Sequence, residues 1–177
     1  MKNTFIDKLS DSARIALRYV LVSLLAYFVA SAVYYFTDTI SRLSIAFAVG
    51  TLWAVIVGVT VIQATWISTL EIARFQILGG FVGAILSLVY LEILPFNPVW
   101  IGLLIGLAVF LCHALNRPDY SVPAALTVAV ILIFSHLNPE PSPLMNTGLR
   151  FSEIIIGSAI AILMVRLLPY EGIKRNK

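Results

Sequence analysis

Charged residues are scarce in this sequence. Only 12% of its 177 residues are Asp, Glu, Lys or Arg, whereas 60% are hydrophobic and the mean hydropathy is +0.96. A soluble domain usually carries about 25% charged residues, with close to half of its residues apolar. A chain this apolar could not cover its hydrophobic side chains with its own polar surface. The composition therefore excludes an ordinary soluble domain and predicts a membrane protein.

Residues for metal binding and catalysis are also few. Cys112 is the only cysteine, so no intrachain disulfide can form, and we expect a small packed side chain there. His113 and His136 have no cysteine or carboxylate at ligand spacing, so no metal or other cofactor is expected. The sequence contains neither a His-Glu-x-x-His helix nor a Gly-x-Ser-x-Gly elbow, and we predict no enzymatic activity. The net charge of +3 is not gathered in one patch, so no nucleic-acid partner is expected.

Long apolar runs dominate what remains. A hydrocarbon core about 30 Å thick needs roughly 17–25 apolar residues per helix. The sequence offers six such runs, and the segments between them contain proline, charge or turn residues. We therefore predict an all-α, polytopic protein with six transmembrane helices in one membrane domain, residues 19–169. The expected spans are 19–36, 43–63, 72–94, 98–115, 121–137 and 149–168.

Both ends of the chain flank this domain with charged residues. Residues 1–18 lack the h-region and cleavage site of a signal peptide, and their apolar side chains fall along one helical face. This pattern is typical of a short amphipathic helix lying in the headgroup region, ahead of the first span. Residues 170–177 form a basic tail.

The positive charges predict the orientation. Six spans put both termini on one side of the bilayer, and cytoplasmic segments carry an excess of Lys and Arg. Only Arg42 and Arg150 fall on the opposite side, so both termini are expected in the cytoplasm, with the protein in the cell inner membrane. The basic residues on the side of the termini are Lys2, Lys8, Arg14, Arg18, Arg74, Arg117, Arg166, Lys174, Arg175 and Lys177.

The third and sixth spans resemble each other. "ARFQILGGFVGAILSLVYLEILP" at 73–95 and "LRFSEIIIGSAIAILMVRLLP" at 149–169 both start with Arg-Phe, place small residues four apart and end in proline. The second and fifth spans also align loosely, 53–64 with 123–134. We predict two three-helix halves, about 15–95 and 98–169, inserted in opposite directions as in many transporters.

Small residues recur along several spans. Glycine and alanine allow helix backbones to approach closely in lipid, and we expect this packing role for most of the glycines. An alternative is that some of them keep a narrow path open between helices. The glycines concerned are Gly50, Gly58, Gly79, Gly80, Gly83, Gly102, Gly106 and Gly157.

A family resemblance covers about 15–169. The stretch "WAVIVGVTVIQATWISTLEIARFQILGGFVGAIL" at 53–86 resembles the signature of the fusaric-acid-resistance and aromatic acid exporter families, and "RFSEIIIGSAIAILMVRLLP" resembles their closing span. The resemblance implies a six-span inner-membrane module of an efflux permease. Many relatives carry a soluble domain and a second membrane half, whereas this sequence stops after Lys177. A homo-oligomer, with a dimer favoured, or a complex with a partner subunit is therefore expected. The family's Gln-Pro-Thr turn reads Gln63-Ala64-Thr65 here.

Arg150 and Glu153 are the most unusual residues in the apolar spans. A charge at mid-membrane costs roughly 2.5–3.5 kcal/mol on insertion scales. Arg150 points along the face of Gly157, and Glu153 can pair with it at i,i+3 spacing. One hypothesis is that Arg150 attracts an anionic substrate and Glu153 modulates it or exchanges a proton. The other is a structural pair that neutralises itself near the interface.

Three further residues are candidates for the substrate path. Arg74 looks like the repeat mate of Arg150, but it falls on the side opposite Gln76, so its side chain can instead reach toward the headgroups. Gln63 and Gln76 flank the same cytoplasmic turn and could donate hydrogen bonds in a site. We expect a permease or channel that moves an organic anion, with aromatic compounds included, out of the cell. The alternative is a small membrane subunit that assembles with or regulates a larger envelope transport system.

Overall fold

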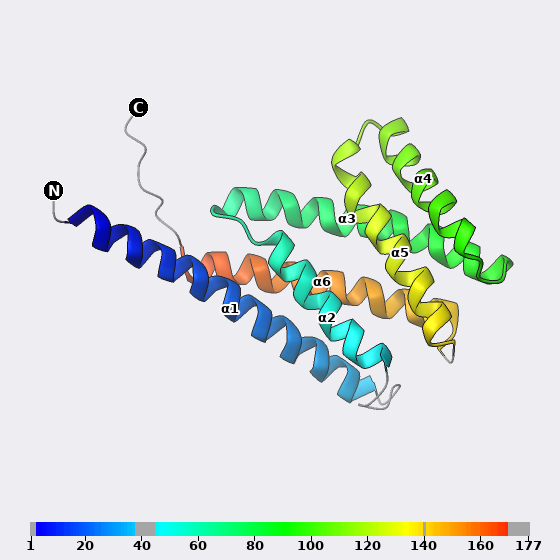
Figure 1. Ribbon diagram of the computed structural model, residues 1–177, viewed down its shortest axis with the longest axis horizontal. Coiled ribbons are helices and arrows are strands. Elements are labelled where there is room, and N and C mark those ends of the chain that lie inside the picture. Colours follow the sequence, from blue (N-terminus) through cyan, green and yellow to red (C-terminus); the bar gives the residue numbers. More distant parts are fainter. Residues whose placement is uncertain (1–2, 38–44, 140, 170–177) are drawn as a thin grey trace.

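The protein is all-helical. The computed structural model describes residues 3–37, 45–139 and 141–169, and within them no strand occurs (Figure 1). The prediction of an all-α fold is confirmed. The described residues form α1 (Asn3–Thr37), α2 (Ile45–Val61), α3 (Trp66–Ile93), α4 (Pro98–Ala114), the short 3-10 helix η1 (Pro118–Tyr120), α5 (Ser121–Leu137) and α6 (Pro143–Leu167).

Four segments are long and apolar enough to cross a membrane. They are Ser12–Tyr35, Trp66–Ile93, Pro118–Leu137 and Pro143–Leu167. The apolar helices α2 and α4 have 17 residues each, about 25 Å at 1.5 Å per residue, which is the lower limit for a span.

Two helices start about one and a half turns earlier than predicted. α3 begins at Trp66 because the Thr65 hydroxyl accepts a hydrogen bond from the Ser68 amide at 3.2 Å. α6 begins at Pro143, where the Ser142 hydroxyl accepts from the Met145 amide at 3.3 Å. Such caps satisfy amides that have no partner within the helix. The earlier start of α6 places Arg150 well inside the helix instead of at its end.

The predicted separate interfacial helix over residues 1–18 is not observed. α1 runs without interruption from Asn3 to Thr37. Its sequence contains neither proline nor glycine, the residues that break helices most strongly, so nothing ends the helix near residue 18. The amphipathic segment is therefore the first part of one long helix.

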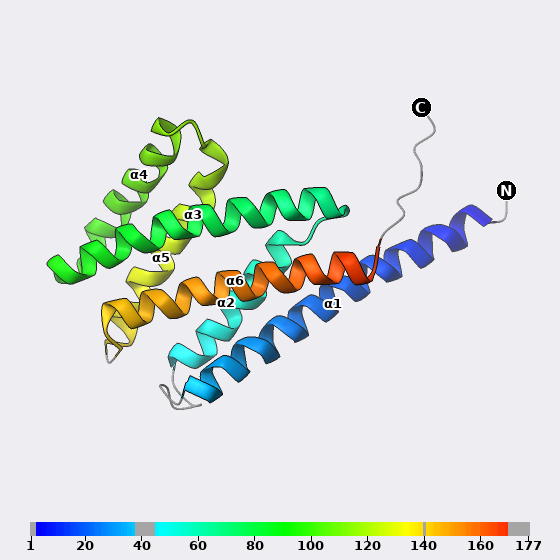
Figure 2. The same cartoon turned by 180° about the vertical axis from the view of Figure 1, so that it is seen from behind.

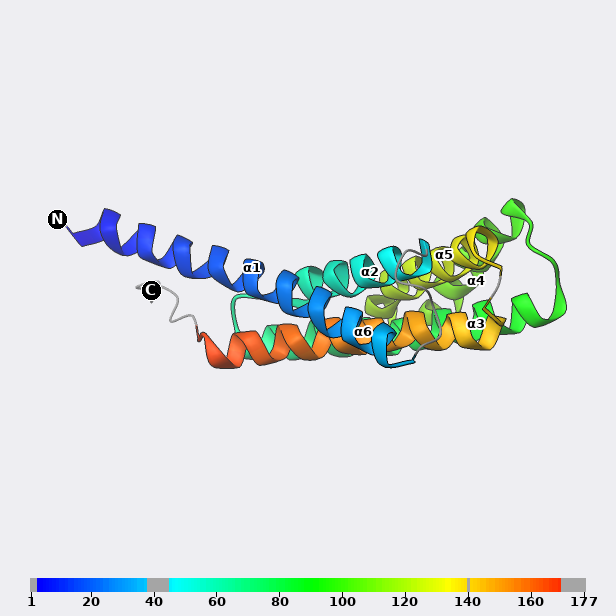
Figure 3. The same ribbon diagram turned by 90° about the horizontal axis from the view of Figure 1, so that it is seen from below.

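α3 and α6 form the centre of the bundle. They run antiparallel and side by side, as the view from behind shows (Figure 2). α2 packs against α6 and α5 packs against α3, and in the view from below these two helices lie over the central pair (Figure 3). α1 then packs against α2 and α6, and α4 against α5.

Glycines allow the closest helix contacts. A Cβ at Gly157 of α6 would lie 2.5 Å from the Ala54 carbonyl oxygen of α2. A Cβ at Gly83 of α3 would collide with the Ala124 carbonyl oxygen of α5. Both contacts are with backbone atoms, so at these two places the helices touch in a way that only glycine permits.

One end of the bundle brings together the middle of α1, the α2–α3 turn and the end of α6, while the first turns of α1 project beyond it (Figure 1). Arg18 joins the three, since its guanidinium donates to the carbonyl of Leu168 after α6 and, at 3.4 Å, to the carbonyl of Ala64. At the same end the Arg166 guanidinium lies 6.0 Å from the Trp66 ring centroid.

Candidate functional site

Arg150, Glu153 and Tyr34 form a buried polar cluster where α1 meets α6. Arg150 Nη1 donates to Glu153 Oε2 at 2.9 Å, and Nη2 donates to the Tyr34 hydroxyl at 3.0 Å. The Tyr34 hydroxyl in turn donates to Glu153 Oε1. The three residues are 0%, 1% and 3% exposed. Each member of the cluster therefore contacts both others, and the cluster lies inside the protein.

Four helices build this cluster. Arg150 lies seven residues after the start of α6 at Pro143, about 10 Å along the helix. On α2, a Cβ at Gly50 would collide with the Tyr34 hydroxyl and Glu153 Oε1, so glycine is required for the space that the cluster fills. On α5, the Phe134 ring lies 4.7 Å from the Arg150 guanidinium carbon, a cation–π contact.

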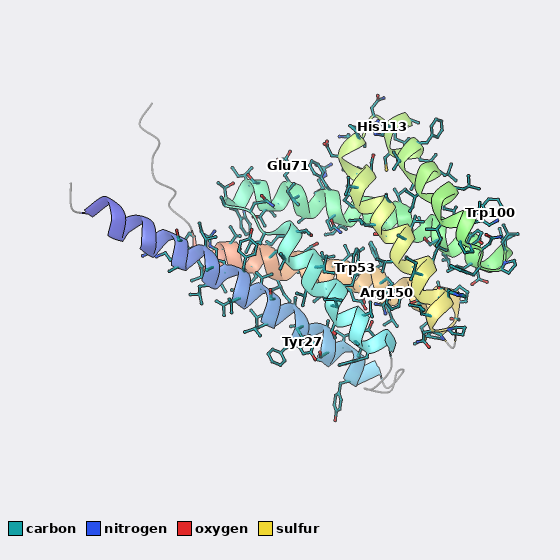
Figure 4. All side chains as sticks on the ribbon, viewed as in Figure 1. Tyr27, Trp53, Glu71, Trp100, His113 and Arg150 are labelled. Atoms are coloured by element: carbon teal, nitrogen blue, oxygen red, sulfur yellow. The ribbon has the colours of Figure 1, made fainter. Side chains whose placement is uncertain are left out.

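The guanidinium therefore lies in the interior of the bundle and not on its surface. Figure 4 shows Arg150 among the helices, whereas Tyr27 of α1 projects away from them. Isolated buried charges are very costly, and a buried pair persists only where hydrogen bonds compensate for lost hydration. The ring of hydrogen bonds between Arg150, Glu153 and Tyr34 supplies this compensation.

Other buried polar groups lie near Arg150 along the same helices. Asn146, one turn earlier on α6, donates to the Ser135 hydroxyl at 2.6 Å. Thr147 Oγ1, three residues before Arg150, and Trp53 Nε1, three residues after Gly50, are buried and have no hydrogen-bond partner among the described residues. Buried donors of this kind are rare in native proteins and call for a partner such as a ligand oxygen or water.

The structure separates the other predicted path residues. Gln76 is buried at 7% exposure, whereas Arg74 is exposed on the other side of α3. Gln63 is half-buried in the α2–α3 turn. Its backbone N–H donates to Thr69 Oγ1 at 3.0 Å, and its side-chain Nε2 donates to the Thr60 carbonyl at 3.3 Å. None of the three is a partner in the hydrogen bonds and ion pair described above for Arg150 and Glu153.

The glycines divide into two groups. A Cβ at Gly50, Gly58, Gly79, Gly80, Gly83 or Gly157 would come within 3.0 Å of a neighbouring helix or turn. Gly102 and Gly106 on α4 are exposed, and a Cβ at either would meet nothing within 4 Å. The predicted packing role therefore fails for these two glycines within the chain, because α4 turns its Leu104 and Ala108 face to the bundle instead.

The buried faces of α3 and α6 match in one register, and those of α2 and α5 match in another. When 74 is added to the residue numbers of α3, every buried residue of this helix except Thr69 coincides with a buried residue of α6. When 70 is added to the residue numbers of α2, every described buried residue of this helix except Gly50 coincides with a buried residue of α5. In the first register Arg150 corresponds to Gln76. In this register Arg74 falls on Gly148 and not on Arg150, because the Arg-Phe dipeptides are two positions out of it.

Tyr34 and Arg18 were missed by sequence reasoning. Tyr34 stands in the apolar stretch "SAVYYFT", where it cannot be told from Tyr35, yet only Tyr34 is buried. Arg18 is one of ten basic residues that the sequence assigns to the side of the termini, yet it is 2% exposed and donates to two carbonyls. The available signal was that Arg18, Val22 and Ala26 follow one another at four-residue intervals, which places Arg18 on the buried face of α1.

The cluster holds no metal-binding arrangement. Within the described part of the chain, no three His, Cys, Asp or Glu side chains lie together. The chemistry available at Arg150 is that of a guanidinium, which binds carboxylate, sulfonate or phosphate oxygens through paired N–H donors.

Comparison with known protein families identifies the family of this chain. A family model described as fusaric acid resistance protein-like matches residues 50–164. The match covers more than half of the sequence, and the chain belongs to this family. The resemblance seen in the sequence is thereby confirmed, and the protein is a membrane protein of a transporter family. Comparisons with curated proteins and with solved structures found no match.

Proposed function

We propose that this protein is an inner-membrane permease or channel that exports an organic anion, with Arg150 as the anion-binding residue. The observation that carries the proposal is a guanidinium, fully buried in a membrane bundle, at the meeting point of α1, α2, α5 and α6. Ionisable residues at such places are costly and usually belong to a substrate or ion path.

The matched registers favour the inverted-repeat architecture. The contacts of the helices α1–α3 have counterparts among those of α4–α6. The contact of α2 with α6 corresponds to that of α5 with α3, and the contact of α1 with α2 corresponds to that of α4 with α5. The Gly157–Ala54 contact likewise corresponds to the Gly83–Ala124 contact. Six crossings, with both termini in the cytoplasm, are consistent with the basic residues at the shared end of α1, α3 and α6. Transporters built in this way hold their substrate near the interface of the repeats.

An aromatic surface next to the cluster favours an aromatic substrate. A groove of about 370 Å³ between α1 and α2 is lined by Tyr27, Phe28, Tyr35 and Phe47, with Ser31 and Ala32. The Phe47 ring stacks edge-on against the Tyr34 ring, with centroids 5.6 Å apart. An aromatic anion on Arg150 would therefore have aromatic side chains nearby for its ring.

The test is flux in liposomes. Purified protein should carry benzenesulfonate, which stays ionised, but not the neutral benzenesulfonamide. Arg150→Gln should reduce the flux by about tenfold or more, because losing one charged hydrogen bond costs about 1.5–3 kcal/mol. The matched control is Arg117→Gln, since Arg117 is exposed. Absence of flux for every organic anion tried, or full flux in Arg150→Gln, would contradict the proposal and favour the alternative of a regulatory subunit.

A further inference from the structure

Arg150 already holds a carboxylate, that of Glu153, at 2.9 Å. We propose that Glu153 is an internal competitor for Arg150, and that a substrate anion replaces it only when Glu153 takes up one proton. This inference rests on the proposed function, binding of an organic anion at Arg150. It adds the coupling: one proton is bound with each anion.

Charge balance inside the bundle requires this exchange. Arg150 and Glu153 together carry no net charge, and both are buried. A further anion would leave one uncompensated negative charge away from water, which is strongly unfavourable. If a proton from water or from the substrate's own acid form adds to Glu153, an O–H bond forms there and the carboxylate charge disappears. The anion then takes its place beside Arg150, and the cluster remains neutral before and after.

Tyr34 can serve both states of Glu153. Its hydroxyl donates to Glu153 Oε1 and accepts from Arg150 Nη2 in the described state. A protonated Glu153 becomes a donor, and a hydroxyl can accept as well as donate. Tyr34 is therefore a positioning residue, which keeps Glu153 within the cluster after its carboxylate leaves Arg150.

Where the structure describes their side chains, the other titratable groups on the helices that contact α6 do not face Glu153. Among the described residues, α2 carries none, and α5 carries only His136, which is exposed and stacked on Phe96 at 4.1 Å. On α6 itself Arg166 is exposed and lies over Trp66.

The same holds for α3 and α1. Glu71, Arg74 and Glu92 of α3 are exposed, and the Tyr90 hydroxyl donates to the Pro95 carbonyl. On α1, Arg18 binds the carbonyls at the opposite end of α6, and the remaining titratable side chains that the structure describes there are exposed. A proton taken up with the anion is therefore assigned to Glu153.

The experiment measures proton uptake during anion binding. Wild-type protein in nanodiscs is titrated with benzenesulfonate by calorimetry in buffers of different ionisation enthalpy, between about pH 6 and pH 8. The probe does not titrate in this range, so any proton taken up belongs to the protein. We expect about one proton per bound anion and an affinity that falls as pH rises, by up to tenfold per pH unit.

Two variants and a control identify the group. Glu153→Gln should bind benzenesulfonate with the same affinity at both pH values and without proton uptake. Tyr34→Phe keeps the carboxylate and should still take up one proton. Glu71→Gln, which removes an exposed carboxylate, should match the wild type.

The outcomes separate the two proposals. Anion binding by the wild type without proton uptake overturns the coupling and leaves the proposed function standing, as does undiminished uptake in Glu153→Gln. Folded wild-type protein that neither binds nor moves any organic anion overturns the proposed function and the coupling with it. If Glu153→Gln does not fold, the proton stoichiometry of the wild type decides alone.

Discussion

Gly157→Ala should destabilise the protein although it adds a single methyl group. A Cβ at this position would lie 2.5 Å from the Ala54 carbonyl oxygen and 2.9 Å from both Gly58 N and Val57 Cβ. All three atoms belong to the backbone or the start of a side chain on α2, so none can move aside by rotating. To reach an ordinary contact of about 3.4 Å, α2 and α6 would have to separate by roughly 0.9 Å.

The size of the effect follows from two opposing terms. Overpacking of a tight core costs about 1–3 kcal/mol. Alanine is a better helix former than glycine by about 1 kcal/mol, which offsets part of this cost. The same helix, α6, offers a matched control in Gly148, where a Cβ would meet nothing within 4 Å. Gly148→Ala gains the helix propensity of alanine without overpacking. Its stability should equal that of the wild type or exceed it by up to about 1 kcal/mol.

Thermal unfolding of purified protein in one detergent compares the two variants. For a chain of this size, each kcal/mol shifts the midpoint by about 2–4 °C. Gly157→Ala should therefore unfold several degrees below Gly148→Ala. Equal midpoints, or a lower midpoint for Gly148→Ala, would show that α2 and α6 do not pack through Gly157 and would refute the assigned helix contact.

Three other substitutions test the polar contacts. Tyr34→Phe leaves Glu153 and Arg150 without the bridging hydroxyl and should cost about 1–3 kcal/mol in thermal unfolding, whereas Tyr27→Phe on the exposed face should have little effect. Arg150→Leu should destabilise by about 3–5 kcal/mol because Glu153 remains buried and unpaired, and adding Glu153→Leu should restore part of the loss; a double variant less stable than the single one contradicts this. Arg18→Gln removes the donor to the carbonyl after α6 and should speed amide hydrogen exchange in the last turn of that helix, while unchanged exchange would contradict the capping role.

The sequence predicts the apolar helices well and their ends less well. Every expected span overlaps one observed helix, because runs of this length can only satisfy their backbone groups as helices in lipid. Thr65 and Ser142 start α3 and α6 earlier than the apolar runs do. Both are favoured N-cap residues, and Ser142 precedes a proline, so capping signals were present in segments that had been interpreted as turns.

For the site, helical periodicity predicts the direction in which a side chain points. It does not predict how deeply the side chain is buried or which residues far away in sequence contact it. Placing Arg150 and Gly157 on one face predicts that Arg150 points into the bundle, and it is buried there. That Tyr34 completes the cluster depends on how α1 crosses α6, 116 positions away in sequence. Local patterns contain no such information. The alignment of α3 with α6 also differs from the one that the sequence suggests, since the Arg-Phe dipeptides stand out in the sequence whereas the buried faces align Gln76 with Arg150.

The most direct test of the account exchanges the two charges. In a double variant with Arg150→Glu and Glu153→Arg, the i,i+3 ion pair is retained and Tyr34 can still bond to both side chains. Stability and benzenesulfonate flux are then measured on the same preparation. We expect a folded protein with little flux, because the guanidinium no longer occupies position 150. Wild-type flux in the exchanged variant would contradict it, since the pair would then serve only to hold the helices together.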